Sequence, residues 1–122
     1  LIPDSGGTFF LPRIVGLQKA TALMMLGDKV TSEEALVMGL VYKIFPTAFF
    51  MDDVKILATT LAAMPTKALG LTKRLLNQSM TNSLELQLAL ESDLQIEASA
   101  SNDYKEGVAA FIEKRTPEFK GN

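Results

Sequence analysis

Apolar residues recur every three or four positions along most of this chain, which is the spacing that places them on one face of an α-helix. Glycines, prolines and short polar runs interrupt the pattern and divide it into separate segments. We therefore expect a string of helices. They span residues 8–15, 17–26, 32–38, 51–64, 66–80, 84–98 and 104–114.

Local signals mark several ends of these helices. Thr31 and Glu34 have the spacing of a capping box, in which each side chain bonds the backbone N–H of the other residue at the start of a helix. Gly27 and Gly39 follow the last apolar positions of two helices, and glycine commonly ends a helix. Pro12 limits the length of the first helix, because proline lacks the N–H that a helix interior needs.

The segment 40–45, Leu-Val-Tyr-Lys-Ile-Phe, is rich in β-branched and aromatic residues and lies between Gly39 and Pro46. These features predict a β-strand. One strand cannot form a sheet by itself. We therefore expect this strand to pair with a partner chain, or to complete a sheet whose other strands precede Leu1.

The chain has 122 residues, which is enough for one domain with a single core that buries roughly two thirds of the unfolded surface. The segment 84–98 carries more leucines than one narrow stripe needs, so we expect it to be covered on more than one side. Leu1 opens directly into a loop, without a methionine or a targeting segment. We therefore interpret the sequence as a fragment of a longer protein.

The composition removes several classes of chemistry. Histidine and cysteine are both absent, which excludes disulfides, thiolate nucleophiles, Ser-His-Asp triads and the commonest zinc ligands. A net charge of −2, with the basic residues spread among acidic ones, argues against a nucleic-acid partner. No apolar run approaches the roughly 20 residues that span a bilayer. We expect a soluble protein without a metal, whose acid–base chemistry depends on Asp, Glu, Lys or Tyr.

Asp4 is the first candidate for such chemistry, because it stands between Pro3 and the small residues 5–7 at the start of a predicted helix. In an apolar pocket a carboxylate becomes a useful general base. On spacing alone, the alternative that Asp4 only caps the helix is favoured. The apolar neighbours that could form the pocket are Leu1, Ile2, Phe9 and Phe10.

Phe111 and Lys114 are three residues apart on the last predicted helix and therefore share a face. An aromatic ring beside an ammonium group could hold a purine and a phosphate. From these two residues alone, a core phenylalanine beside a solvated lysine is the simpler interpretation.

Motifs spread over essentially the whole chain match one known family. They lie at residues 2–8 (Ile-Pro-Asp-Ser-Gly-Gly-Thr), 11–16, 22–27, 34–41 and 103–121. In this set of motifs the chain resembles the enoyl-CoA hydratase/isomerase (crotonase) superfamily. The aspartate after Ile-Pro makes it most similar to the 1,2-epoxyphenylacetyl-CoA isomerase branch.

This resemblance implies a subunit about twice as long, in which a spiral of ββα turns precedes helices that build trimers or dimers of trimers. The present chain would then be mainly α. Residues 1–46 would be the end of the spiral core, and residues 47–122 would be the C-terminal helical oligomerisation region.

The resemblance also implies an activity. Asp4 stands where hydratases usually carry glycine, and in the isomerase branch this aspartate is the single acid–base residue. We expect an acyl-CoA isomerase that moves a proton on an enoyl-CoA, or acts on a ring-epoxide phenylacetyl-CoA, through an enolate-type intermediate. The oxyanion-hole N–H groups and the second glutamate of hydratases would lie upstream of Leu1, so the isolated chain should be inactive. The alternatives are an enoyl-CoA hydratase and a non-catalytic oligomerisation module.

In relatives, the positions of Phe111 and Lys114 reach into a neighbouring subunit and contact the adenine and phosphate of CoA. Thr8, Phe9 and Arg13 are expected at a trimer interface or in the pocket. Coenzyme A is part of the substrate, so no separate cofactor is expected. The expected partners are an acyl-CoA and further copies in a homotrimer or hexamer, without nucleic acid or membrane, in the cytoplasm and in phenylacetate or fatty-acid metabolism.

Overall fold

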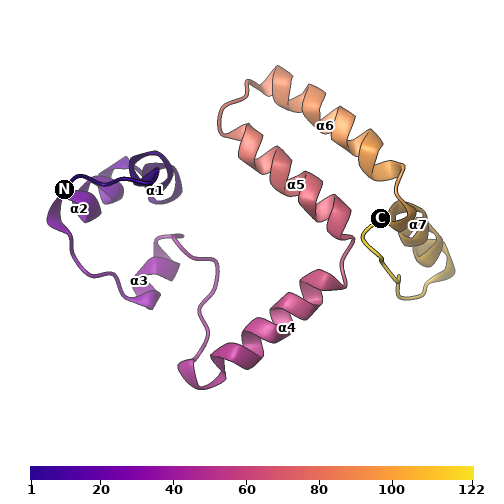
Figure 1. The fold of residues 1–122 in the computed structure, drawn as a ribbon, viewed down its shortest axis with the longest axis horizontal. Coiled ribbons are helices and arrows are strands. Elements are labelled where there is room, and N and C mark those ends of the chain that lie inside the picture. Colours follow the sequence, from indigo (N-terminus) through magenta and orange to yellow (C-terminus); the bar gives the residue numbers. More distant parts are fainter. The chain divides into compact units, whose positions relative to one another are not determined.

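The computed structural model describes all residues from Leu1 to Asn122 and contains helices but no strand (Figure 1). The chain divides into two compact units, residues Leu1–Phe50 and Met51–Asn122. The mainly α fold expected from the sequence is confirmed. The helices are α1 (Gly7–Val15), α2 (Leu17–Leu26), α3 (Ser32–Val37), the short 3₁₀ helix η1 (Thr47–Phe49), α4 (Phe50–Ala62), α5 (Thr66–Ser79), α6 (Leu84–Ser99) and α7 (Asn102–Glu113).

In the first unit, α1 and α2 pack against each other. Gly16 is the single residue between them, and its φ of 83° with ψ of 154° lies in a region that essentially only glycine adopts. Pro12 lies inside α1. The chain therefore reverses within one residue, which places the end of α1 directly beside the start of α2.

The predicted capping box at the start of α3 is confirmed. The Glu34 N–H donates to the Thr31 hydroxyl at 3.2 Å, and the Thr31 N–H donates to the Glu34 carboxylate at 2.9 Å. The bond from the Thr31 backbone is the main cause that lowers the pKa of Glu34. Two sequence-local bonds thus start this short helix at the expected residue.

The predicted strand at residues 40–45 is wrong for this chain, since the segment is irregular. The N–H groups of Leu40 and Val41 turn back and donate to the Ala35 carbonyl at 2.9 and 3.3 Å. A strand requires a hydrogen-bonded neighbour, and the chain contains no other extended segment that pairs with this one. Residues 40–45 have a composition that favours a strand, but they form none here because no neighbouring strand is present to bond with them.

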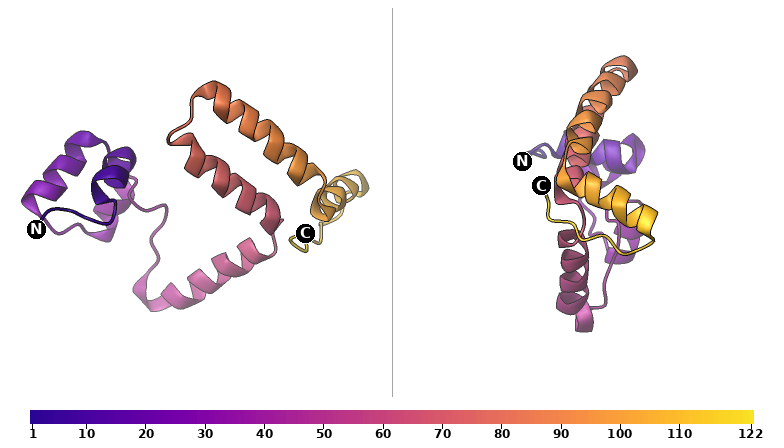
Figure 2. Two further views of the ribbon diagram at one scale, coloured as in Figure 1. Left: turned by 45° about the horizontal axis from the view of Figure 1, so that its top comes forward. Right: turned by 90° about the vertical axis from the view of Figure 1, so that its right-hand side faces the viewer.

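In the second unit, α5 and α6 lie side by side and antiparallel (Figures 1 and 2). The Ser83 hydroxyl accepts from the Leu86 N–H at 3.3 Å and caps α6, and the Gln87 side chain donates to the Leu75 carbonyl across the pair. The Ser101 hydroxyl accepts a backbone N–H of α7 in the same way, so α7 begins at Asn102, two residues before the expected start.

The expectation of a single large core is wrong. The buried apolar residues are Ala20, Ala35, Leu94 and Ala110. Along α6, Leu94 is 5% exposed whereas Leu84 is 69% exposed, because α5 covers one side of α6 and leaves leucines uncovered elsewhere. The apolar residues that suggested a core therefore lie largely on the surface of this chain.

We predict that Thr31→Ala lowers the free energy of unfolding of the full-length protein by about 1 kcal/mol, because the N-terminal N–H groups of α3 lose their side-chain acceptor. Thr31→Ser keeps the hydroxyl and should stay within about 0.5 kcal/mol of the wild type. Urea unfolding followed by circular dichroism measures both variants. Equal losses in the two variants would contradict a capping role.

Candidate functional site

Asp4 opens a tight turn that leads into α1. The Gly7 N–H donates to the Asp4 carbonyl at 2.8 Å, and the two residues between them have positive φ, 51° at Ser5 and 82° at Gly6. Positive φ at both central positions is the pattern of a type I′ turn. The Asp4 side chain is exposed and projects from a turn whose backbone is defined.

Glycine is favoured at position 6 of this turn for two reasons. Its φ is positive, and a Cβ atom at this position would meet the Phe10 ring at 3.0 Å. Gly6, not Asp4, is the residue that precedes α1, and no side chain caps the helix there. The interpretation of Asp4 as a helix cap is therefore wrong.

The apolar pocket expected around Asp4 is not formed by its neighbours in this chain. Leu1 and Ile2 are exposed, and Phe10 is 56% exposed. The environment of the Asp4 carboxylate is thus open in this structure.

Phe9 and Arg13 lie together on α1, one helical turn apart. The Arg13 guanidinium carbon lies 3.7 Å from the centre of the Phe9 ring, and its Nη1 donates to the Phe9 carbonyl at 2.8 Å. Phe10 meets Phe9 edge-on. Thr8 instead lines a cavity of about 300 Å³ against α2, together with Pro12. The structure therefore groups Phe9 with Arg13 and places Thr8 at this separate cavity.

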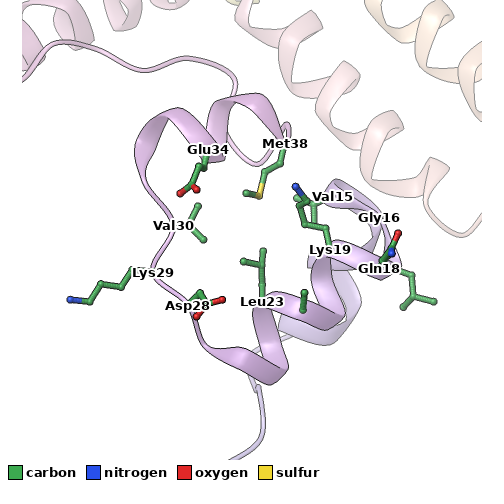
Figure 3. A pocket seen from close by; sticks show the side chains of 12 residues that line it. Val15, Gly16, Gln18, Lys19, Leu23, Asp28, Lys29, Val30, Glu34 and Met38 are labelled. Atoms are coloured by element: carbon green, nitrogen blue, oxygen red, sulfur yellow. The ribbon is translucent and has the colours of Figure 1, made fainter.

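A larger cavity of about 680 Å³ lies between α2, α3 and the segment that joins them (Figure 3). Leu23, Val30 and Met38 point into it from three segments, and Lys29 points away. None of the residues predicted for the site lines it. The sequence carries no signal for this cavity, because it depends on how α2 and α3 pack.

Phe111 and Lys114 stand at the end of α7 in the second unit. Phe111 is 85% exposed, so the interpretation of Phe111 as a core residue is wrong. With Tyr104, Val108 and Phe119 it lines an apolar groove of about 440 Å³. Lys114 has a φ of 56° and a ψ of 38°. This is the left-handed conformation in which many helices end, and the residue that adopts it is usually glycine.

The only non-glycine residues with positive φ are Ser5 and Lys114. Ser5 adjoins Asp4, and Lys114 is itself a predicted site residue. Left-handed backbone at a non-glycine residue costs of the order of 1–3 kcal/mol and tends to occur at functional sites. Backbone strain thus lies at one candidate residue, Lys114, and directly beside the other, Asp4.

After Lys114 the chain reverses and runs back along α7; we call residues 115–122 the strap (Figure 2). Its far end is held by Asp103, whose buried carboxylate accepts the N–H groups of Lys120 at 2.7 Å and Gly121 at 2.8 Å. The Asp103 N–H in turn donates to the Asn122 carbonyl. Asp103 therefore fastens the end of the strap to the first turn of α7.

Glu106 holds the strap nearer to its start. Its two carboxylate oxygens accept Nη1 and Nη2 of Arg115 at 2.6 and 2.9 Å, and Oε1 also accepts the Glu118 N–H at 2.9 Å. These bonds, that of Arg115 foremost, lower the pKa of Glu106 to about 2. The bonds from the Arg115 guanidinium to Glu106, and from its Nε to Glu113, raise the pKa of Arg115. No sequence motif predicted a role for Asp103 or Glu106, which lie one turn apart on α7.

None of the helices combines the length and the apolar character that crossing a bilayer needs. No three His, Cys, Asp or Glu side chains are arranged so that they could hold a metal ion.

Comparison with known proteins decides the family. A model of the family described as enoyl-CoA hydratase/isomerase matches residues 1–122, which is the whole chain. The chain belongs to the enoyl-CoA hydratase/isomerase family. The resemblance seen in the sequence motifs is thereby confirmed.

Individual members of the enoyl-CoA hydratase/isomerase family agree with this assignment. The chain is 44% identical to the 1,2-epoxyphenylacetyl-CoA isomerase of Escherichia coli over 99% of its own length and 46% of that protein. It is 36% identical to the 2,3-dehydroadipyl-CoA hydratase of the same organism, over 99% of this chain and 46% of that protein. The chain thus spans about half the length of the curated relatives it matches.

A solved family structure also superposes on this chain. The crystal structure of the enoyl-CoA hydratase from Bacillus anthracis gives a TM-score of 0.93 at 31% identity, over 100% of this chain and 47% of that one. The helical fold described above is therefore a part of the enoyl-CoA hydratase/isomerase fold. Relatives named isomerase and relatives named hydratase both match it.

We predict that Glu106 makes the stability of this family member depend on pH. The folded pKa of about 2 lies below the ordinary value of 4.5, so the stabilisation is present above pH 4.5 and is lost as the pH falls toward 2. Glu106→Gln should therefore lower the melting temperature at pH 6, and the difference from wild type should shrink as the pH falls to 3. Thermal unfolding of the full-length protein measures this.

The matched control is Glu97→Gln, since Glu97 is an exposed carboxylate on α6. It should show no such pH-dependent difference. A gap between wild type and Glu106→Gln that stays constant from pH 6 to pH 3 would contradict the role of the Glu106 charge.

Proposed function

We propose that the full-length protein is an acyl-CoA isomerase in which Asp4 is the acid–base residue. The observation that carries this proposal is the turn at residues 4–7, which projects a carboxylate that neither caps α1 nor forms an ion pair. The family assignment supplies the substrate class, because its members named above carry the names of enzymes that act on CoA thioesters. The relative with 44% identity is named as an isomerase.

One carboxylate is sufficient for this reaction. The Asp4 carboxylate takes a proton from one carbon of the acyl group, the electron pair moves into an enolate of the thioester, and the protonated side chain returns the proton to another carbon. The enolate oxygen requires N–H donors aimed at it. We propose that these donors come from residues outside this sequence, so that the 122-residue chain alone has no turnover.

The second candidate activity is enoyl-CoA hydration. The 36% identity to a relative named 2,3-dehydroadipyl-CoA hydratase favours it. Addition of water normally uses a second group that positions the water molecule. The first unit presents one exposed carboxylate in the turn before α1, and for this reason we place isomerisation first.

We further propose that Phe111 and Lys114 bind the adenine and a phosphate of coenzyme A. Both ion pairs of the structure belong to Arg115, so the Lys114 ammonium has no carboxylate partner and stays available for an anion. Phe111 offers an exposed ring three residues away. The two cations that follow each other in the sequence thus have different roles.

The uncovered apolar faces support an assembly. Large exposed apolar surfaces mark sites of protein contact. We propose that the rest of the polypeptide and neighbouring copies cover them in a homotrimer or hexamer, in the cytoplasm, with Thr8, Phe9 and Arg13 near an interface or the pocket. An oligomerisation module without catalysis remains the alternative from a different class.

We predict that Asp4→Asn in the full-length protein lowers kcat by about 10²- to 10⁴-fold, because the amide cannot take up the proton. The oligomeric state should not change, since the side chain does not cap α1. Isomerase and hydratase assays with an enoyl-CoA, together with analytical ultracentrifugation, measure both effects.

Asp28→Asn is the matched control, because Asp28 is an exposed aspartate of the same unit that is not part of the turn. Its kcat should equal that of the wild type. Full isomerase activity in Asp4→Asn would exclude the proposed role, and loss of hydration without any isomerisation would favour the hydratase.

We predict that Lys114→Ala raises KM for the acyl-CoA about tenfold and leaves kcat almost unchanged, because a charged bond to a remote part of the substrate contributes equally before and in the transition state. Lys73→Ala removes an exposed lysine from α5 and should leave KM unchanged. Steady-state kinetics measures the split. A lower kcat with the wild-type KM would remove Lys114 from the ligand site.

A further inference from the structure

The strap is fixed to α7 at both ends, although it contains no regular secondary structure. Asp103 holds Lys120 and Gly121 at the far end, and Glu106 holds Arg115 and Glu118 nearer to the start. The Phe119 ring also lies close to the backbone of α7 where Gly107 carries no side chain. An otherwise irregular segment is thus held in one path.

The strap follows Lys114, whose left-handed backbone conformation is unfavourable for a residue other than glycine. Lys114 takes the left-handed conformation at the end of α7, and the Arg115 N–H donates to the Ala110 carbonyl at 3.0 Å. Glycine is the usual residue in that position of a helix end. A lysine persists in such a conformation when the surrounding structure holds it there.

Two carboxylates of α7 hold the side chain of the residue after Lys114: Glu113 accepts Nε of Arg115 at 2.6 Å, and Glu106 accepts its two outer nitrogens. Arg115 is the next residue along the chain, and its guanidinium is bound through both outer nitrogens to Glu106, a bidentate geometry that is both strong and directional. The bond from the Glu118 N–H to the same carboxylate fixes the strap three residues further on. Loss of the Glu106 carboxylate would therefore remove the bidentate bond to Arg115 and the bond to Glu118, and so loosen the chain on the strap side of Lys114, while the bonds of Arg115 to Glu113 and to the Ala110 carbonyl remain.

We propose that Glu106 is a positioning residue for binding of the phosphate-bearing end of the thioester substrate. Glu106 acts through Arg115 and the strap, which keep the Lys114 backbone in the conformation from which the Lys114 ammonium meets the phosphate. Glu106 also binds the Arg115 guanidinium, so that this neighbouring cation does not compete with Lys114 for the phosphate. This inference rests on the proposed contact of Lys114 with coenzyme A and extends it to a residue that does not touch the ligand.

The test compares Glu106→Gln with the wild type in the full-length enzyme. We expect KM for the acyl-CoA to rise about fivefold while kcat stays within about twofold, because a neutral amide holds the guanidinium much less strongly than a carboxylate does. Arg115→Lys keeps the charge but loses the bidentate fork, and it should change KM in the same direction. Glu97→Gln is the control and should change neither parameter.

A double-mutant cycle separates positioning from a general loss of structure. In the Lys114→Ala background, Glu106→Gln should raise KM no further, because the group that it positions is gone. Limited proteolysis with trypsin, read by mass spectrometry, should show faster cleavage after Lys114 and Arg115 in Glu106→Gln than in the wild type.

The outcomes distinguish this inference from the proposed function. If Lys114→Ala raises KM but Glu106→Gln does not, the positioning role is wrong and the Lys114 contact stands. If the two KM effects multiply in the double mutant, Glu106 acts independently of Lys114 and the positioning role is again wrong. If Lys114→Ala leaves KM unchanged, the Lys114 contact fails and the role of Glu106 fails with it.

Discussion

The rest of the structure depends on one constraint, which is that the chain does not cover its own apolar faces. Its buried apolar residues are three alanines and Leu94, and most of the larger apolar side chains of the helices are exposed. Full burial of a leucine or isoleucine contributes about 1.5–3 kcal/mol, so most of the available hydrophobic stabilisation is not used within the chain. Helices of this length are marginal without tertiary packing. Burial within this chain therefore supplies only a small part of the stabilisation that these helices need.

Features determined by nearby residues could be predicted from the sequence. The capping box of Thr31 and Glu34 and the helix stop at Gly27 appear as expected, because both depend on residues within one turn. The strand at residues 40–45 and the single core were wrong, because each depends on a partner that the sequence pattern cannot show. The structure divides into two compact units after Phe50, close to the boundary after residue 46 that the sequence predicts. The assignment of residues 1–46 to the end of a spiral core stays a prediction.

The candidate site follows the same division. Asp4 and Lys114 were predicted from motifs. Lys114 is one of the two non-glycine residues with positive φ, and Asp4 adjoins the other, Ser5. The roles of Asp103 and Glu106 could not be found in this way, because they appear only when the strap returns along α7. Arg115 illustrates the difference, since its bonds to Glu106 span nine residues of sequence and form only where the strap folds back on α7.

The turn before α1 has a consequence for how chemistry can change on this scaffold. Asp4 contributes only its carbonyl to the turn, and its side chain supports no packing in the first unit. The carboxylate can therefore be exchanged for another group at little cost to folding, while Gly6 keeps the path of the backbone. The proposed acid–base position is thus separate from the residues that hold the turn, so a substitution there changes the exposed group and leaves the backbone path unchanged.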